Sequence, residues 1–383
     1  MAGKPRVSFR ILQPDPFDLH RHPDIPLLFA ALLPTQSQSV HFKNALLDHA
    51  TASQISLRSD HSIRWRMTLS AGTSFTKKIL DSFPGLARQM EVGLKGYSRP
   101  SSWTLSSGQG WKIRWANKTQ VMGILNVTPD SFSDGGQFLD PVVAVDQALR
   151  MQQEGADWID VGGESTRPGA KALPVSEEKK RILPVLRACV KVLKVPLSVD
   201  TYKAETAKAS VGEGARLVND IGALRLDPRM GKTLARLNVP VVLMHMKGRP
   251  RIMQKNPRYQ DVIGEIISFF RERLRFAQEC GIHEDRIILD PGFGFGKTPW
   301  HNLELTRRLW EFKVLGRPLL LGPSRKSTLG TLLGGAPPEE RVEGTAAAVT
   351  AAILKGADFV RVHDVKTMAR VVKIADAIRY QPF

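Results

Sequence analysis

Polar side chains that could bind or transform a ligand follow several short apolar runs of this sequence. Among them are Asp200, Asn219 and Asp290, each at or beside the end of such a run. Carboxylate and amide oxygens accept hydrogen bonds, so together they would suit a ring that carries several fixed N–H groups. A site of this kind discriminates strongly, because a wrong ring would leave buried acceptors unpaired. Taken singly, each acid has an alternative role as a helix cap or a rim salt bridge.

A second set of residues has the chemistry of an anion site. Arg361 and His363 leave the last apolar run two residues apart, so on a strand both point to one face. Thr166 and Arg167 can offer a hydroxyl and a planar cation to phosphate oxygens. Asn126 ends the first run, and its amide oxygen could ligate Mg²⁺, a hard ion that prefers oxygen. For an isolated Asn, a hydrogen bond to a loop backbone is the alternative.

The elements that must position these side chains are eight apolar runs, most of them followed by a helix-like stretch. The runs are Val121–Leu125, Trp158–Val161, Pro196–Val199, Leu217–Val218, Pro240–Met244, Arg286–Leu289, Pro318–Leu321 and Phe359–Val362. In a (β/α)8 barrel the C-terminal strand ends carry the chemistry and the strand interiors fill the core. The sequence therefore predicts an α/β protein with a TIM barrel and an enzyme site. An open doubly wound sheet is the alternative fold.

The N-terminal part is predicted to be a separate small α/β domain over residues 1–100, followed by a linker at 101–110 and a barrel over 111–383. Trp111–Trp115 and the turn after it are expected to form a hairpin that leads into the first barrel strand and plugs the barrel's N-terminal mouth. A stabilising or subunit-contact role for the extra domain is favoured over a regulatory one. Its predicted elements are strands at Arg6–Leu12 and His61–Ser70 and helices at Ile25–Leu33, Phe42–Ala50 and Phe75–Gly96.

Composition excludes several other classes of protein. The net charge of +18 is spread along the 383 residues without a basic tail, so no nucleic-acid binding is expected. The longest apolar stretch, Leu27–Leu33, is too short to span a bilayer, and no signal peptide is recognised. Cys189 and Cys280 fall in predicted helices, which favours reduced thiols and a cytoplasmic location.

Several loop motifs in this order resemble the dihydropteroate synthase family from about Trp111 to the C-terminus. They are Asn126-Val-Thr-Pro-Asp-Ser-Phe-Ser-Asp-Gly-Gly136, Gly162-Gly-Glu-Ser-Thr-Arg-Pro-Gly169, Asp290-Pro-Gly-Phe-Gly-Phe-Gly-Lys297, Ser324-Arg-Lys-Ser327 and Arg361-Val-His-Asp364. The resemblance implies condensation of 6-hydroxymethyl-7,8-dihydropterin diphosphate with p-aminobenzoate. The products would be dihydropteroate, a folate precursor, and pyrophosphate. It also implies a homodimer and susceptibility to sulfonamides. Residues 1–100 resemble, weakly, the N-terminal extension of some bacterial members.

The resemblance implies a role for each motif residue. The residues implied to bind the pterin are Asp200, Asn219, Asp290, Met244, Phe295 and Lys326. Those implied to bind the diphosphate are Asn126, Thr166, Arg167, Arg361 and His363. Those implied to shape the p-aminobenzoate site are Phe132, Pro168, Lys326 and Ser327. The implied catalytic residues are Asn126, Asp130, Lys326, Arg361 and His363, with Mg²⁺ as cofactor at Asn126.

The leaving group sets the expected mechanism. An aryl amine is unprotonated at neutral pH, so its attack needs no strong base, and the barrier lies in breaking the methylene–oxygen bond. Stabilising charge on the departing diphosphate lowers that barrier. Because the dihydropterin ring can support a cationic methylene, a dissociative, SN1-like path is expected. The alternative functions are a pterin-dependent methyltransferase and a non-catalytic pterin-binding paralogue.

Overall fold

The computed structural model describes most of the chain. The described residues are 8–13, 27–33, 35–49, 52–57, 62–67, 69–98, 102–108, 110–128, 141–165, 172–248 and 252–380. The chain forms two compact units, one made of residues 1–100 with 308–317 and the other of residues 101–307 with 318–383. We call them the N-terminal unit and the barrel unit.

The barrel unit contains an eight-stranded parallel sheet. Its strands are β7 (Gln120–Asn126), β8 (Trp158–Gly162), β9 (Leu197–Asp200), β10 (Leu217–Asp220), β11 (Val241–Met244), β12 (Ile287–Asp290), β13 (Leu320–Leu321) and β14 (Phe359–Val362). They pair in the order β12-β11-β10-β9-β8-β7-β14-β13. A parallel bridge between Leu289 and Leu319 joins the two ends of this order and closes the sheet. The predicted (β/α)8 barrel is confirmed, and the open doubly wound sheet is excluded.

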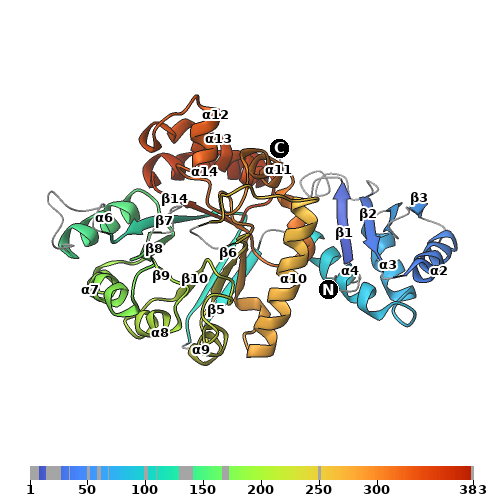
Figure 1. Cartoon of the computed structure of the whole chain (residues 1–383), viewed down its shortest axis with the longest axis horizontal. Helices are drawn as coiled ribbons and strands as arrows, with labels where there is room; N and C mark the ends of the chain where they lie inside the picture. Colours follow the sequence, from blue (N-terminus) through green and yellow to red (C-terminus); the bar gives the residue numbers. More distant parts are fainter. Residues whose placement is uncertain are drawn as a thin grey trace. The chain divides into compact units, whose positions relative to one another are not determined.

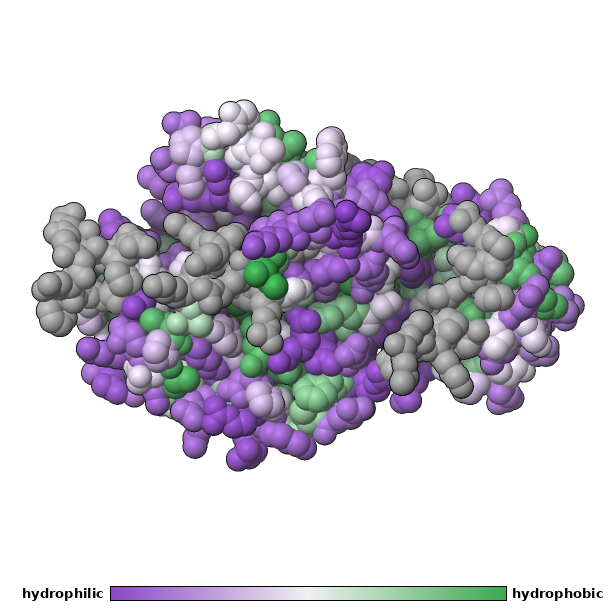
Figure 2. Space-filling model, in the orientation of Figure 1, coloured by the Kyte–Doolittle hydropathy of each residue, from purple (hydrophilic) through white to green (hydrophobic). Residues whose placement is uncertain are grey.

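Helices surround the barrel strands at the predicted places (Figure 1). They are α6 (Pro141–Gln153), α7 (Val175–Val192), α8 (Ala204–Gly212), α9 (Met230–Leu237), α10 (Val262–Cys280), α11 (Pro299–Arg307), α12 (Ser327–Leu332), α13 (Val342–Leu354) and α14 (Val365–Tyr380). One face of each longer helix packs inward; in α7 this face includes Ile182, Val185 and Leu186. The surface over α7 to α9 is accordingly mostly hydrophilic (Figure 2). No helix among the described residues has the length and apolar character needed to cross a membrane.

A hairpin closes the N-terminal mouth of the barrel. The prediction of a linker at 101–110 is wrong, because Ser102–Ser106 forms strand β5, which pairs antiparallel with β6 (Lys112–Ala116). The predicted hairpin at Trp111–Trp115 is present, and its other strand is β5, which lies within the predicted linker. Trp103 and Leu105 alternate along β5 toward the barrel, a period-two pattern hidden among serines.

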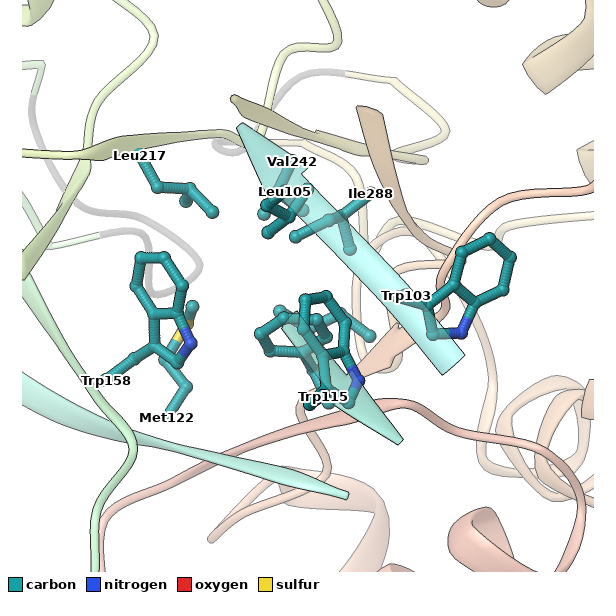
Figure 3. Close-up of a cluster of buried hydrophobic side chains, with 10 residues drawn as sticks. Trp103, Leu105, Trp115, Met122, Trp158, Leu217, Val242 and Ile288 are labelled. Atoms are coloured by element: carbon teal, nitrogen blue, oxygen red, sulfur yellow. The ribbon is translucent and has the colours of Figure 1, made fainter. Parts of the chain in front are cut away.

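The predicted role of this hairpin as a plug is confirmed. Trp103, Leu105 and Trp115 converge on side chains from the starts of the barrel strands (Figure 3). The Trp115 and Phe359 rings meet edge to face at 5.1 Å, and Trp103 Nε1 donates to Asp358 Oδ1 at 2.9 Å. The apolar floor therefore lies at the N-terminal end, which leaves the C-terminal end for polar chemistry.

The N-terminal unit is built on a four-stranded antiparallel sheet of order β1-β2-β4-β3. The prediction of a helix at Ile25–Leu33 is wrong, because Leu27–Leu32 is strand β2, paired on both sides. A short unbroken apolar run suits a buried helix or a buried strand equally, and pairing with the neighbouring strands decides the outcome. The elements are β1 (Ser8–Gln13), β2, α2 (Gln36–Leu47), β3 (Ser53–Leu57), β4 (Ser62–Met67), α3 (Leu69–Lys78) and α4 (Pro84–Ser98).

The N-terminal unit also contains a short segment from far along the chain. Residues 308–317, which include the 3-10 helix η2 (Leu309–Leu315), connect α11 to β13 but pack within this unit. Glu311 is buried there and accepts from Arg10 Nη2 at 2.6 Å. On α4, a Cβ at Gly93 would lie 2.8 Å from Val314 Cγ2, so the missing side chain allows this close packing. The compact unit is therefore larger than the predicted domain 1–100.

Candidate active site

The C-terminal strand ends bring the predicted acceptor residues together. Asp200 ends β9, Asn219 lies next to the end of β10, and Asp290 ends β12. Asp200 is paired in register with Gly162 on one side and with Asn219 on the other. Arg361 on β14 reaches across the barrel interior, where its Nη2 donates to Asp200 Oδ2 at 2.8 Å. Because these strands are parallel and buried, their polar ends converge at one end of the barrel.

A residue absent from the sequence prediction links this cluster. Asp160 on β8 is fully buried and accepts from Ser198 Oγ at 2.5 Å, from Asn219 Nδ2 at 2.9 Å and from Arg361 Nε at 2.6 Å. Three donors, one of which is the cation Arg361, offset the large desolvation penalty of a buried carboxylate. The sequence carried one signal for it, an acid in the middle of the apolar run Trp158–Val161.

Burial changes the acidity of the cluster. Desolvation raises the pKa of Asp200 to about 7, although the neighbouring Arg361 opposes the rise. Desolvation likewise raises the pKa of Asp290 to about 6, against the hydrogen bond from the Gly292 N–H and the charge of Lys297. Burial therefore moves the pKa of both carboxyls toward neutral pH, a shift typical of functional sites.

The loop after β12 fixes Asp290. Gly292 N donates to Asp290 Oδ1 at 2.7 Å, and Gly292 has a φ of +73°. A Cβ on Gly292 would lie 1.9 Å from the His245 carbonyl oxygen, so the loop needs glycine here. The buried Lys297 Nζ donates to the carbonyls of Gly292 at 2.9 Å and Phe295 at 3.1 Å and lies 3.0 Å from His245 Nδ1. Lys297, which the sequence prediction missed, thus holds the loop from inside.

An apolar wall borders the acceptors. Met244 and Phe295, both predicted to line the faces of a ring, pack in one cluster with Ile221, Met246 and Met253. Lys326 Nζ lies 4.2 Å from the centre of the Phe295 ring. The charge of Lys326 also lowers the pKa of both Asp200 and Asp290 against their burial. Its predicted position beside a second ligand stays a prediction.

The predicted anion-binding residues divide into described and undescribed ones. Arg361 lies on β14, and His363 directly follows the end of that strand. Burial and three nearby cations lower the pKa of His363 to about 3. Asn126 ends β7, and Ser327 begins α12. The remaining predicted residues lie outside the described ranges: Asp130, Phe132, Thr166, Arg167 and Pro168.

The arrangement suits a flat ring with several N–H groups bound against an apolar wall, next to cations that can hold an anion. The Asp200 carboxylate accepts from Arg361, and the Asp290 carboxylate accepts from the Gly292 N–H of its own loop. These hydrogen bonds are not those of a helix cap. Among the described residues no group of three or more acidic, His or Cys side chains could hold a metal ion.

Comparison with known proteins identifies the family. Residues 122–363 match the pterin binding enzyme family. A dihydropteroate synthase of Synechocystis sp. is 48% identical over 264 residues, which are 69% of this chain and 91% of the relative. Two solved dihydropteroate synthases superpose with a TM-score of 0.68. That of Yersinia pestis with a sulfonamide drug complex is 43% identical and covers 72% of this chain and 99% of its own. That of Xanthomonas albilineans with 4-aminobenzoic acid is 44% identical and covers 73% and 100%. The chain therefore belongs to the family of pterin-binding enzymes, among the dihydropteroate synthases.

Proposed function

We propose that the barrel unit condenses 6-hydroxymethyl-7,8-dihydropterin diphosphate with p-aminobenzoate and so acts as a dihydropteroate synthase in folate biosynthesis. The observation that carries this proposal is the acceptor set of the buried Asn219 and Asp290 and the partly buried Asp200 beside an apolar wall. Its position at the C-terminal end of a TIM barrel, in a member of this family, supports an enzymatic role.

The pterin end derives its selectivity from buried acceptors. The amino and ring N–H groups of a pterin would donate to the carboxylates of Asp200 and Asp290 and to the amide oxygen of Asn219. The amide nitrogen of Asn219 already donates to Asp160, which leaves the amide oxygen of Asn219 for the ligand. A ring without matching N–H groups would leave these buried acceptors unpaired, at a cost of about 1–3 kcal/mol each.

The diphosphate would lie beside Arg361 and His363. A Cβ on Gly162 would make ordinary contacts with Asp200 Cβ at 3.4 Å, Asp200 Oδ2 at 3.8 Å and Asn126 Oδ1 at 3.9 Å, so both oxygens lie close to this glycine. Such oxygens fit Mg²⁺, and Asn126 would hold the ion with the substrate's own diphosphate oxygens as further ligands. Bound Mg²⁺ would neutralise charge on the departing diphosphate. We expect Thr166 and Arg167 to contribute donors there.

The second substrate would approach from the loop side. Ser327, exposed at the start of α12, suits the carboxylate of p-aminobenzoate, and the preceding residue, Lys326, lies against the Phe295 ring of the apolar wall. Asp130, Phe132 and Pro168 stay predictions for the part of the site that closes over the reacting methylene. We expect an SN1-like path, because the amine needs no base and the cluster aids departure of the anion. Sulfonamides, which imitate p-aminobenzoate, would compete at this site.

We also propose that the protein is a homodimer through its barrel helices. The exposed apolar residues Ile374 and Ile378 on α14 support a contact surface there. Light scattering of the purified chain tests this: a mass near twice the 42.5 kDa of the chain supports it, and a monomer contradicts it.

The experiment for the function measures pyrophosphate release from dihydropterin diphosphate, with and without p-aminobenzoate and Mg²⁺. The proposal requires release that depends on both and an equal amount of dihydropteroate. Tight pterin binding without turnover would support the methyltransferase or the binding-only alternative, and methyl transfer from a methyl-folate would then separate those two.

A further inference from the structure

A buried hydroxyl touches His363 and is not used by the reaction described above. Ser324 follows β13 and is only 2% exposed. Its Oγ lies 3.0 Å from His363 Nδ1 and accepts from the His363 backbone N–H at 3.1 Å. The serine thus contacts both the ring and the main chain of the histidine that is expected to meet the diphosphate.

The hydrogen bonds determine which ring nitrogen carries the proton. A serine hydroxyl has one proton, and the His363 N–H already occupies a lone pair of Oγ. Among the described residues, His363 Nδ1 is the only acceptor within hydrogen-bond distance of this hydroxyl. A buried hydroxyl proton needs an acceptor, so Oγ donates to Nδ1. The Nδ1 atom then carries no proton, and the proton of a neutral ring lies on Nε2.

The surroundings of His363 keep the ring neutral. The side chain is partly buried, and Arg361, Arg325 and Lys326 all disfavour a second positive charge, while Asp364 alone opposes them. Burial and these cations place the pKa of His363 at about 3. A doubly protonated ring would also put a proton on Nδ1 and deprive the serine hydroxyl of its acceptor.

The position of Ser324 is fixed independently of His363. The next residue, Arg325, forms an ion pair with Asp364, with Nε 3.0 Å from Oδ2. Arg325 has a left-handed φ of +56°, and its backbone is held by Thr345 Oγ1 at 3.2 Å and by Arg341 Nη1 at 2.8 Å. These contacts hold the loop after β13 against the end of β14, so the serine orients the ring and not the reverse.

We propose that Ser324 is a positioning residue that holds His363 as the neutral Nε2–H tautomer, so that the ring presents an N–H donor to the departing diphosphate. This inference rests on the proposed function for the identity of the anion. It deepens that function by assigning His363 a hydrogen bond to the leaving group and no transferred proton. A neutral donor stabilises growing negative charge without changing its own protonation state.

The first test reads the tautomer directly. The full chain, labelled with ¹⁵N in its histidines, is studied at pH 7 by long-range ¹H–¹⁵N correlation, and a His363→Gln variant assigns the signal. We expect an unprotonated Nδ1 and a protonated Nε2 at His363. Ser324→Ala should convert this pattern into a mixture, whereas Ser324→Thr, which keeps the hydroxyl, should retain it. A wild-type His363 ring protonated on Nδ1 would overturn the proposal whatever the two Ser324 variants show.

The second test reads the consequence for catalysis. We expect Ser324→Ala to lower kcat for pyrophosphate release on the order of 10- to 100-fold, while the Kd for a dihydropterin without diphosphate stays unchanged. Ser324→Thr should restore most of kcat. Thr331→Ala is the matched control, because it removes an exposed hydroxyl that donates to the Ser327 carbonyl on α12, so it should leave the His363 tautomer unchanged. An unchanged kcat in Ser324→Ala would refute the role. Absence of turnover in the wild type would refute the proposed function and leave the tautomer measurable.

Discussion

At the scale of single residues, Arg361 forms ion pairs with two carboxylates. Its guanidinium pairs with the fully buried Asp160 through Nε at 2.6 Å and with Asp200 through Nη2 at 2.8 Å. The sequence places Arg361 at the diphosphate end, but these contacts also make it part of the pterin end. A change at Arg361 therefore affects both halves of the site.

We expect Arg361→Ala to destabilise the folded protein by about 3–5 kcal/mol, because it leaves the Asp160 carboxylate buried without its cation. The double variant Asp160→Asn with Arg361→Met removes both charges and should recover most of that loss. Urea unfolding followed by circular dichroism measures the cycle. Equal unfolding free energies for Arg361→Ala and the wild type would show that the pair is not coupled in this way.

The acidity of the pocket predicts a pH dependence of pterin binding. Burial raises the pKa of Asp200 to about 7 and that of Asp290 to about 6, while Arg361, Lys326 and Lys297 favour the charged forms. A pterin needs ionised acceptors, so its affinity should rise as pH increases from 5 to about 7.5. Each carboxyl adds about a tenfold loss per pH unit below its pKa. Calorimetric titration across this range tests the prediction, with Asp290→Asn as a non-binding control; a flat profile would contradict it.

The sequence predicts the strand-end residues well for a physical reason. Parallel strands buried on both faces read as apolar runs, so a polar residue at the end of a run stands out, as Asp200 and Asp290 do. The strand-end rule does not predict Asp160 as a site residue, because Asp160 lies within an apolar run. Only its hydrogen-bond partners on β9, β10 and β14 show why an acid is tolerated there. Lys297 is not predicted either, because a lysine in a loop is usually solvated and only the fold shows that this one is buried.

At the scale of elements, the loop Asp290–Lys297 depends on glycine conformation. Gly292→Ala would combine a φ of +73° with a Cβ 1.9 Å from a backbone oxygen, so we expect loss of pterin binding and of stability. The matched control is Gly334→Ala. Gly334 has a φ of +69°, but a Cβ added there would have no atom within 4 Å. This control should cost only the left-handed conformation, roughly 1–2 kcal/mol. Unfolding and pterin-binding measurements compare the two variants, and equal effects would show that contact with His245 is unimportant.

The hairpin β5–β6 shows that a sequence pattern can predict a strand without predicting the strand with which it pairs. Alternation in Trp111–Trp115 predicts a strand, and β6 confirms it, but alternation does not name the partner strand. The partner β5 lies in a segment rich in serine and glycine, which are typical of linkers. Its two inward side chains nevertheless supply the apolar face. Pairing is a property of the assembled barrel mouth, so composition alone misassigned this segment.

At the scale of the whole molecule, the compact units do not follow the sequence order. The barrel runs and their helices are local patterns, and their order predicts the fold. The N-terminal unit takes in residues 308–317, which lie far from residues 1–100 in sequence. No local pattern marks such a long-range association, and the apolar content of Leu309–Leu315 is equally typical of a barrel helix.

This composition of the N-terminal unit predicts the result of removing residues 1–100. The apolar side chains of Phe312 and Val314 are buried within that unit, and exposing each would cost about 1.5–3 kcal/mol. We expect a chain that begins at Ser101 to bind more hydrophobic dye and to melt at a lower temperature than the full chain. The same truncation with Phe312→Ser and Val314→Ser should bind less dye, which serves as the matched control. A truncated chain with unchanged melting and dye binding would contradict the dependence of η2 on residues 1–100.

Unchanged kcat and oligomeric state, alongside lowered stability, would identify the unit as a stabilising module, whereas an altered kcat would indicate regulation.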